Sequence, residues 1–189
     1  MEKLSRREVV QRLLGGAAAG RVLALAASSH PIYRHLIGDG SDLERAEGMR
    51  GAADWTPLFL NAGQDQELVA VAEAMVPGST GAGVNRFIDL LLTVDTKEHQ
   101  REFVASIEAL ESDAKKRFGR GFAALKSNEQ EALLTEFSSQ EGRREDFYNL
   151  KEWITGAYYS SEQGMRELGW NGNYAFESFP GCGHGEQHR

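Results

Sequence analysis

The chain has 189 residues, 41% of them hydrophobic and 26% charged, with a formal net charge of −7 at neutral pH. This acidic balance argues against a nucleic-acid partner, because contacts to phosphates need clustered Lys and Arg side chains. The single cysteine, Cys182, excludes an internal disulfide and a c-type haem attachment, which needs two cysteines before its histidine. The length fits one domain after a short N-terminal extension.

The first 26 residues have the features of a short N-terminal targeting signal. Arg6 and Arg7 stand side by side after Ser5, and a weakly apolar run rich in Gly and Ala follows. A membrane span needs about 20 predominantly apolar residues. The apolar run here covers only residues 13–27 and contains Arg21, so we expect no transmembrane span.

The Arg6-Arg7 pair resembles the twin-arginine export signal, although Val9 and Val10 stand where that pattern prefers Phe and Leu. The triplet "ALA" at residues 24–26 fits a small-residue cleavage site. We therefore predict a twin-arginine signal peptide over residues 1–26 and a periplasmic location. An ordinary N-terminal helix with two adjacent arginines is the alternative interpretation.

Residues 27–57 are punctuated by Gly, Asp and Pro and show little periodicity, which predicts an extended arm or loop. From residue 58 the apolar residues recur with helical spacing. Asn61 and Gln64 have the spacing of a capping box, and Pro77-Gly78 ends the helix that they begin. A second helix is predicted over residues 83–94.

A third helix is predicted from about residue 96 to residue 118, with Asp95 and Glu98 at capping spacing and Gly119 at its end. A fourth helix is predicted to begin at Ser127, which we expect to cap it together with Gln130.

The fifth and longest predicted helix covers about residues 144–168. No sustained alternation of period 2 and no internal repeat is present. We therefore predict an all-α fold, with a single helical domain over residues 58–169 that holds about five helices in an irregular bundle.

Residues 170–189 differ from the rest and are predicted to form a non-helical, Gly-rich tail. Its aromatic side chains follow no helical period, and they are Trp170, Tyr174, Phe176 and Phe179. Large aromatic side chains are costly to leave in water, so the tail must pack against something. We predict that it binds another chain; the alternative is that it covers the bundle's own core.

Cys182, His184 and His188 form a possible set of metal ligands, although a tetrahedral zinc site needs four. A tail that happens to contain two histidines is the plainer interpretation. For Cys182 itself, a disulfide to another subunit and a buried free thiol are further alternatives. No strand followed by G-x-G-x-x-G, no Walker loop and no G-x-S-x-G elbow is found, so we predict no catalytic, cofactor-binding or metal-binding residue.

Three stretches together resemble a known family. They are the twin-arginine start, residues 58–92 ("LFLNAGQDQELVAVAEAMVPGSTGAGVNRFIDLLL") and the closing "GMRELGWNGN…FPGC". In order and spacing they are similar to the gluconate 2-dehydrogenase subunit 3 family, the small subunits of exported flavin-dependent sugar and polyol dehydrogenases.

The resemblance implies a chain that is not an enzyme on its own and holds no cofactor. It implies a large FAD-containing partner of the glucose-methanol-choline oxidoreductase type, which has no export signal of its own. The folded pair would cross the membrane on the small subunit's signal and pass electrons to a c-type cytochrome subunit with haem c, where one is present. A free-standing periplasmic helical binding protein, or an enzyme built on the Cys182, His184 and His188 cluster, are the alternatives.

Overall fold

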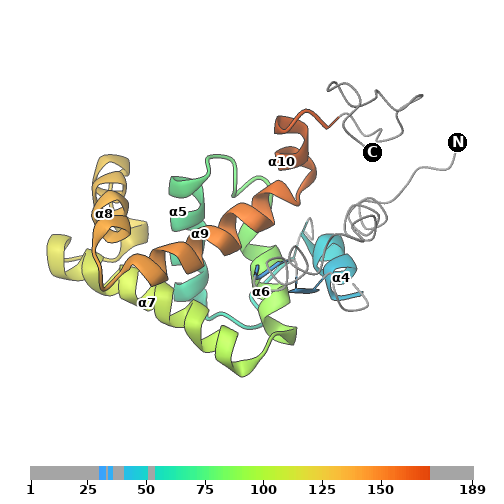
Figure 1. Ribbon diagram of the computed structural model, residues 1–189, viewed down its shortest axis with the longest axis horizontal. Helices are drawn as coiled ribbons and strands as arrows, with labels where there is room; N and C mark the ends of the chain where they lie inside the picture. Colours follow the sequence, from blue (N-terminus) through green and yellow to red (C-terminus); the bar gives the residue numbers. More distant parts are fainter. Residues whose placement is uncertain (1–29, 33, 36–40, 51–53, 171–189) are drawn as a thin grey trace, which may run out of the picture.

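A computed structural model describes residues 30–32, 34–35, 41–50 and 54–170 of the chain. Within these ranges it contains seven α-helices and one 3-10 turn, and no strand (Figure 1). The all-α prediction is therefore confirmed. The helices are α4 (Ser41–Met49), α5 (Ala62–Met75), α6 (Val84–Val94), α7 (Lys97–Phe118), α8 (Ser127–Ser139), α9 (Arg144–Tyr159) and α10 (Glu162–Glu167).

Helix α9 lies at the centre of the bundle and packs against α5, α6, α7, α8 and α10 (Figure 1). Helix α7 runs beside it, and α4 packs on α6. The core between these helices is aromatic as well as aliphatic, because Trp153 of α9 meets Phe103 of α7 edge-on, with ring centroids 5.4 Å apart. Both rings are buried, so the α7–α9 contact contributes a large share of the apolar burial.

The predicted boundaries of α5 are confirmed. The Asn61 side chain accepts a hydrogen bond from the Gln64 N–H at 2.9 Å, and the Gln64 side chain accepts one from the Asn61 N–H at 3.1 Å. These reciprocal bonds satisfy two N–H groups that the first helical turn leaves open. Gly119 ends α7 in the left-handed conformation, at φ 73°, which glycine adopts without strain.

Two predicted caps are wrong. Helix α7 is capped by Thr96, whose hydroxyl accepts from the His99 N–H, because Asp95 is engaged in other contacts. Helix α8 begins with Ser127 as its first helical residue rather than its cap. The Glu129 carboxylate accepts the Lys126 N–H at 2.8 Å there, a charge-assisted bond that places the cap one residue earlier.

The long helix predicted over residues 144–168 is also wrong, because the chain breaks into α9 and α10 at Ser160 and Ser161. The Ser161 hydroxyl accepts the Gly164 N–H at 3.1 Å and so caps α10. Gly164 then lies against the end of α9, where an added Cβ would overlap the carbonyl oxygen of Tyr158.

The segment predicted as an extended arm is helical in part, since residues 41–49 form α4. This helix buries only Ala46 completely, which leaves little apolar periodicity to reveal it. Upstream of it, Ile32 is buried in the core with 2% of its surface exposed. No helix in the described ranges has the length and apolarity that crossing a bilayer requires.

Replacing Gly164 by Ala tests the close contact between α9 and α10. The new methyl group would overlap the Tyr158 carbonyl, a backbone atom that cannot rotate away, so α10 must shift. We expect a loss of about 2 kcal/mol in the free energy of unfolding, measured by denaturant titration. Gly142→Ala is the control, because nothing lies within 4 Å of a Cβ there. Equal stability of the two variants would contradict the packing.

Candidate functional site

Most of the residues that the sequence singles out lie outside the described ranges. These are the export-signal residues Ser5, Arg6 and Arg7, the tail aromatics Tyr174, Phe176 and Phe179, and the cluster Cys182, His184 and His188. Trp170 is described three residues after the end of α10, where its backbone N–H donates to the Met165 carbonyl at 2.9 Å and the residue is half-buried. Its predicted role at an interface stays a prediction.

Within the described residues, several charged side chains hold the connecting segments in place through hydrogen bonds. Asp89 of α6 has no exposed surface and accepts three backbone N–H groups, from Leu58 at 2.7 Å, Phe59 at 3.0 Å and Leu60 at 2.8 Å. A buried carboxylate needs such donors, because an unpaired buried charge is strongly unfavourable. The segment before α5 is thereby held along α6.

Asp95, between α6 and α7, collects four partners. Arg34 donates to one carboxylate oxygen, and the His35 Nε2 lies 3.8 Å from that same oxygen. The other oxygen contacts the His99 Nδ1 at 2.9 Å and accepts the Thr96 N–H at 2.8 Å. Burial opposes ionisation of Asp95, but the nearby His35 ring and the hydrogen bonds from His99, Arg34 and the Thr96 backbone together hold its pKa below its usual range.

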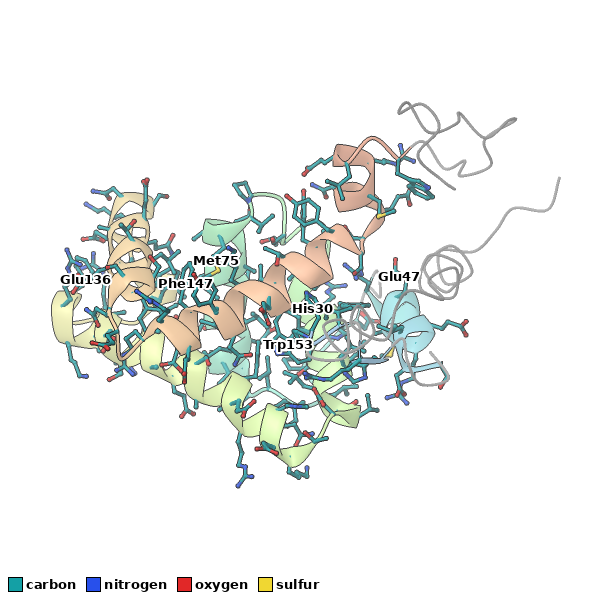
Figure 2. All side chains as sticks on the ribbon, in the orientation of Figure 1. His30, Glu47, Met75, Glu136, Phe147 and Trp153 are labelled. Atoms are coloured by element: carbon teal, nitrogen blue, oxygen red, sulfur yellow. The ribbon has the colours of Figure 1, made fainter. Side chains whose placement is uncertain are left out.

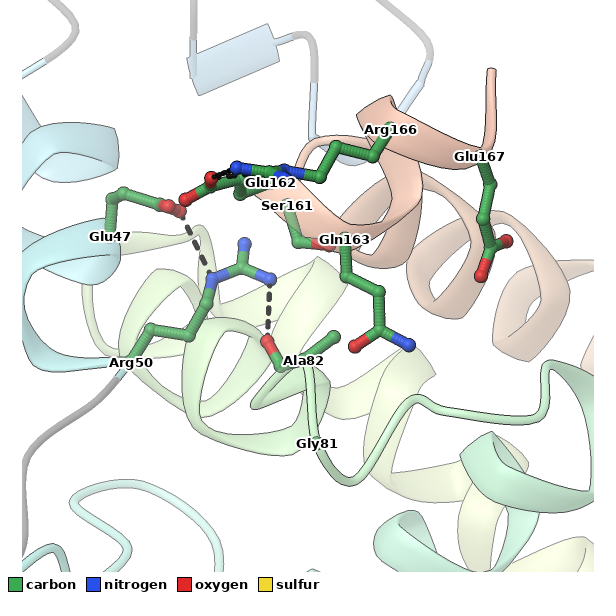
Figure 3. A pocket seen from close by; sticks show the side chains of 9 residues that line it. All are labelled: Glu47, Arg50, Gly81, Ala82, Ser161, Glu162, Gln163, Arg166 and Glu167. Carbon is green, nitrogen blue, oxygen red and sulfur yellow. Dashed lines mark hydrogen bonds and ion pairs between the residues drawn. The ribbon is translucent and has the colours of Figure 1, made fainter. Parts of the chain in front are cut away.

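Arg50, just after α4, joins three elements (Figure 3). Its guanidinium donates to the carbonyl of Ala82 at 3.0 Å and to that of Ala157 at 3.1 Å, and it pairs with Glu47 at 3.0 Å. It also lies over the Phe87 ring, 4.0 Å from the centroid. Since Ala157 is in the last turn of α9, a cation here also suits the negative end of the helix dipole.

A surface pocket of about 720 Å³ lies beside Arg50, between α4, the loop before α6 and α10 (Figure 3). Its charged groups pair with one another, as Glu162 does with Arg166 at 2.5 Å. The Ser161 hydroxyl in its wall caps α10, and no histidine or cysteine is among its lining residues. The arrangement can bind polar groups of a partner, but it brings no nucleophile together with a base.

The described ranges also contain no group of three His, Cys, Asp or Glu side chains able to hold a metal ion. Sequence reasoning missed Arg50 and Asp89, and it used Asp95 only as a cap. For Asp89 a signal existed, because one carboxylate stands alone in the apolar run "FIDLLL". Arg50 carries no such local signal, since only Glu47 among these partners is near it in the chain and the carbonyls of Ala82 and Ala157 are 32 and 107 residues away.

Tyr158, near the end of α9, connects α10 to α9. Its hydroxyl donates to Glu167 at 2.6 Å and accepts from the Gln163 side chain at 3.3 Å. Burial, together with the hydrogen bond to the Glu167 carboxylate, raises the pKa of Tyr158 to about 12. The folded chain therefore keeps this proton at a pH where the unfolded chain, with a tyrosine pKa of about 10, has lost it.

This shift predicts how stability changes in alkali. The contribution of the Tyr158 hydroxyl is complete below about pH 10 and is lost as the pH rises from about 10 to about 12. We expect the difference in unfolding free energy between wild type and Tyr158→Phe to shrink across that range. The control is Tyr148→Phe, at an exposed position of the same helix. A difference that stays constant up to pH 12 would refute the Tyr158–Glu167 bond.

Comparison with protein families gives one match, to gluconate 2-dehydrogenase subunit 3, over residues 62–181. The matched residues include every helix from α5 to α10 and extend into the tail. Comparisons with curated proteins and with solved structures find no match. Since the match covers well over half of the chain, the protein belongs to the gluconate 2-dehydrogenase subunit 3 family and is by that membership a small subunit of such a dehydrogenase complex.

Proposed function

We propose that this chain is the non-catalytic small subunit of a periplasmic FAD-dependent dehydrogenase of the glucose-methanol-choline type that oxidises a sugar or polyol. It binds the large flavoprotein, supports its folding and stability, and carries it through twin-arginine export. The flavin belongs to the partner, and haem c to a cytochrome subunit where one is present. The observation that carries the proposal is the family match over residues 62–181, behind an N-terminus with Arg6 and Arg7.

The architecture supports an accessory role. The helical body has a continuous apolar core of its own, and its connecting segments are held by internal hydrogen bonds such as those to Asp89. Such a body can fold before it meets its partner. A folded flavoprotein that lacks an export signal of its own acquires one by binding this chain.

We place the contact with the flavoprotein at the C-terminal end. Leu168, at the end of α10, is 67% exposed, and Trp170 follows it as the first of four aromatic residues in the tail. Interfaces are enriched in aromatic side chains, and a few of them dominate the affinity. Cys182 would strengthen this contact if it pairs with a cysteine of the flavoprotein, which requires Cα atoms roughly 4.4–6.8 Å apart.

The export role predicts that this chain and the flavoprotein are exported, or retained in the cytoplasm, together. When Arg6 and Arg7 are both replaced by Lys, we expect this chain and the flavoprotein to remain together in the cytoplasm, because one signal serves both. Flavin content and dehydrogenase activity are measured in the periplasmic and cytoplasmic fractions. The matched control is Arg12→Lys, a leader arginine outside the pair. Normal periplasmic activity of the double variant would contradict the proposal.

The interface role predicts a selective effect of Trp170→Ala. Losing a central aromatic side chain should weaken the complex by at least about 2 kcal/mol, or roughly thirtyfold in Kd. The melting temperature of the isolated small subunit should change little. Tyr148→Ala removes an exposed aromatic side chain from the middle of α9 and should leave Kd unchanged. A large fall in melting temperature with intact binding would assign Trp170 to the chain's own core.

A further inference from the structure

A second surface pocket, of about 610 Å³, lies between the start of α7 and the segment before α5. Phe59 lines one side of it, and the other side is one face of α7, because the lining residues recur there with helical spacing. They include Lys97, Arg101, Val104, Ala105 and Glu108. We call this site the α7 pocket. Figure 1 places the first turns of α7 well away from α10, so the α7 pocket is separate from the region of Trp170.

Both sides of the α7 pocket are fixed by the fold. The backbone N–H groups of residues 58–60 donate to Asp89, and Phe59 itself packs against the core. On the other side, α7 is anchored on α9, where Phe103 meets Trp153, the residue labelled in Figure 2. A pocket with fixed sides loses little conformational freedom when it is occupied, which favours binding.

Two cations of the α7 pocket have no carboxylate partner among the described residues. The Arg101 Nε donates to the Lys97 carbonyl at 3.1 Å, and the Lys97 ammonium donates to the Gln100 side chain at 3.0 Å. Glu108, the one carboxylate that lines the pocket, accepts instead from Gln64 at 3.3 Å. The arginines that do pair with carboxylates are Arg34, Arg50, Arg117, Arg120, Arg143 and Arg166. The α7 pocket thus presents two positive charges that the described part of the fold does not neutralise.

The stability of α7 does not account for these charges. Lys97 is the first residue of the helix, at the end whose dipole favours anions, and Arg101 is one turn further on. A cation at this end is unfavourable for folding, but the helix dipole adds to the positive potential that an anionic group meets in the pocket. Phe59 and Val104, both half-buried, supply apolar surface beside the two charges. The α7 pocket therefore matches a large apolar side chain that stands next to carboxylates.

We propose that the α7 pocket is a second contact with the flavoprotein, and that it binds an acidic segment of that subunit in which Asp or Glu flanks a large apolar side chain. This inference rests on the proposed function, which supplies the partner. The carboxylates bind Lys97 and Arg101, and the apolar side chain contacts Phe59 and Val104. Charge complementarity of this kind orients a partner as it binds. The net charge of −7 argues against a nucleic acid or an anionic membrane, because such extended surfaces would also meet the acidic remainder of the chain.

The experiment measures the Kd between the full-length chain and the purified flavoprotein at about 0.1 M and about 1 M salt, where the Debye length is about 10 Å and about 3 Å. Lys97→Glu combined with Arg101→Glu should raise Kd at least about tenfold at the lower salt concentration and less than about threefold at the higher, where charge attraction is screened. Its melting temperature should not fall, since both side chains are exposed. The matched control, Arg144→Glu combined with Lys151→Glu, makes the same change of charge at exposed positions of α9 and should leave Kd unchanged.

A second variant fills the α7 pocket without changing its charge. Ala105→Trp places a bulky ring in the pocket and should weaken binding at both salt concentrations, whereas Ala132→Trp, at an exposed position of α8, should not. Wild-type affinity of Ala105→Trp, or of the Lys97 and Arg101 double variant at the lower salt concentration, would overturn the inference. If that double variant binds the flavoprotein normally but no longer binds phosphatidylglycerol vesicles, the pocket serves a membrane instead. A wild-type chain that forms no complex with the flavoprotein contradicts the proposed function itself, and the inference with it.

Discussion

A buried carboxylate between two helices determines where the N-terminal part of this protein lies. Asp95 is almost fully enclosed, and a charge in that position is stable only when donors surround it. Two of its partners, Arg34 and His35, come from a segment about 60 residues earlier in the chain. Removing one partner of such a buried pair costs about 3–5 kcal/mol. The position of Ile32 in the core and of Arg34 over Trp153 therefore depends on Asp95.

Carboxylates that accept backbone N–H groups also hold other connecting segments of the bundle in place. Asp89 holds residues 58–60, and Glu73 accepts the N–H groups of Gly78 at 2.8 Å and Thr80 at 2.9 Å. The hydrogen bonds from these two N–H groups lower the pKa of Glu73, which lies exposed at the surface. Connecting segments in such a body are therefore parts of the fold. A body with such fixed connections suits the proposed accessory role, in which residues 1–26 are an export signal and the C-terminal end contacts the flavoprotein.

The sequence predicted best what depends on local pattern. Helices α5 to α8 follow apolar periodicity, and Asn61 and Gly119 are boundary signals that act within one turn. The break before α10 was missed because the apolar stripe runs on to Met165 and Leu168 across it. Helix α4 was missed because Ala46 is its only fully buried residue, which leaves little apolar periodicity in its sequence.

The contacts of Arg50 and Asp95 join residues far apart in the chain, and no local pattern encodes such pairs. Family membership could be recognised from motifs, since the resemblance rests on the order of short stretches that the matched range of residues 62–181 largely contains. The tail residues assigned to the interface lie mostly beyond the described ranges.

Residues 30–35 hold their contacts to Asp95 and Trp153 only if this N-terminal segment is part of the folded body. Hydrogen exchange at the Arg34 and His35 amides, which donate to the carbonyls of His30 and Ile32 at 3.1 Å and 3.2 Å, tests this directly. We expect both amides to be protected in the wild-type chain and to exchange freely in Asp95→Asn, while the amides of α9 stay protected in both. Rapid exchange of Arg34 and His35 in the wild-type chain, beside a protected α9, would contradict the account.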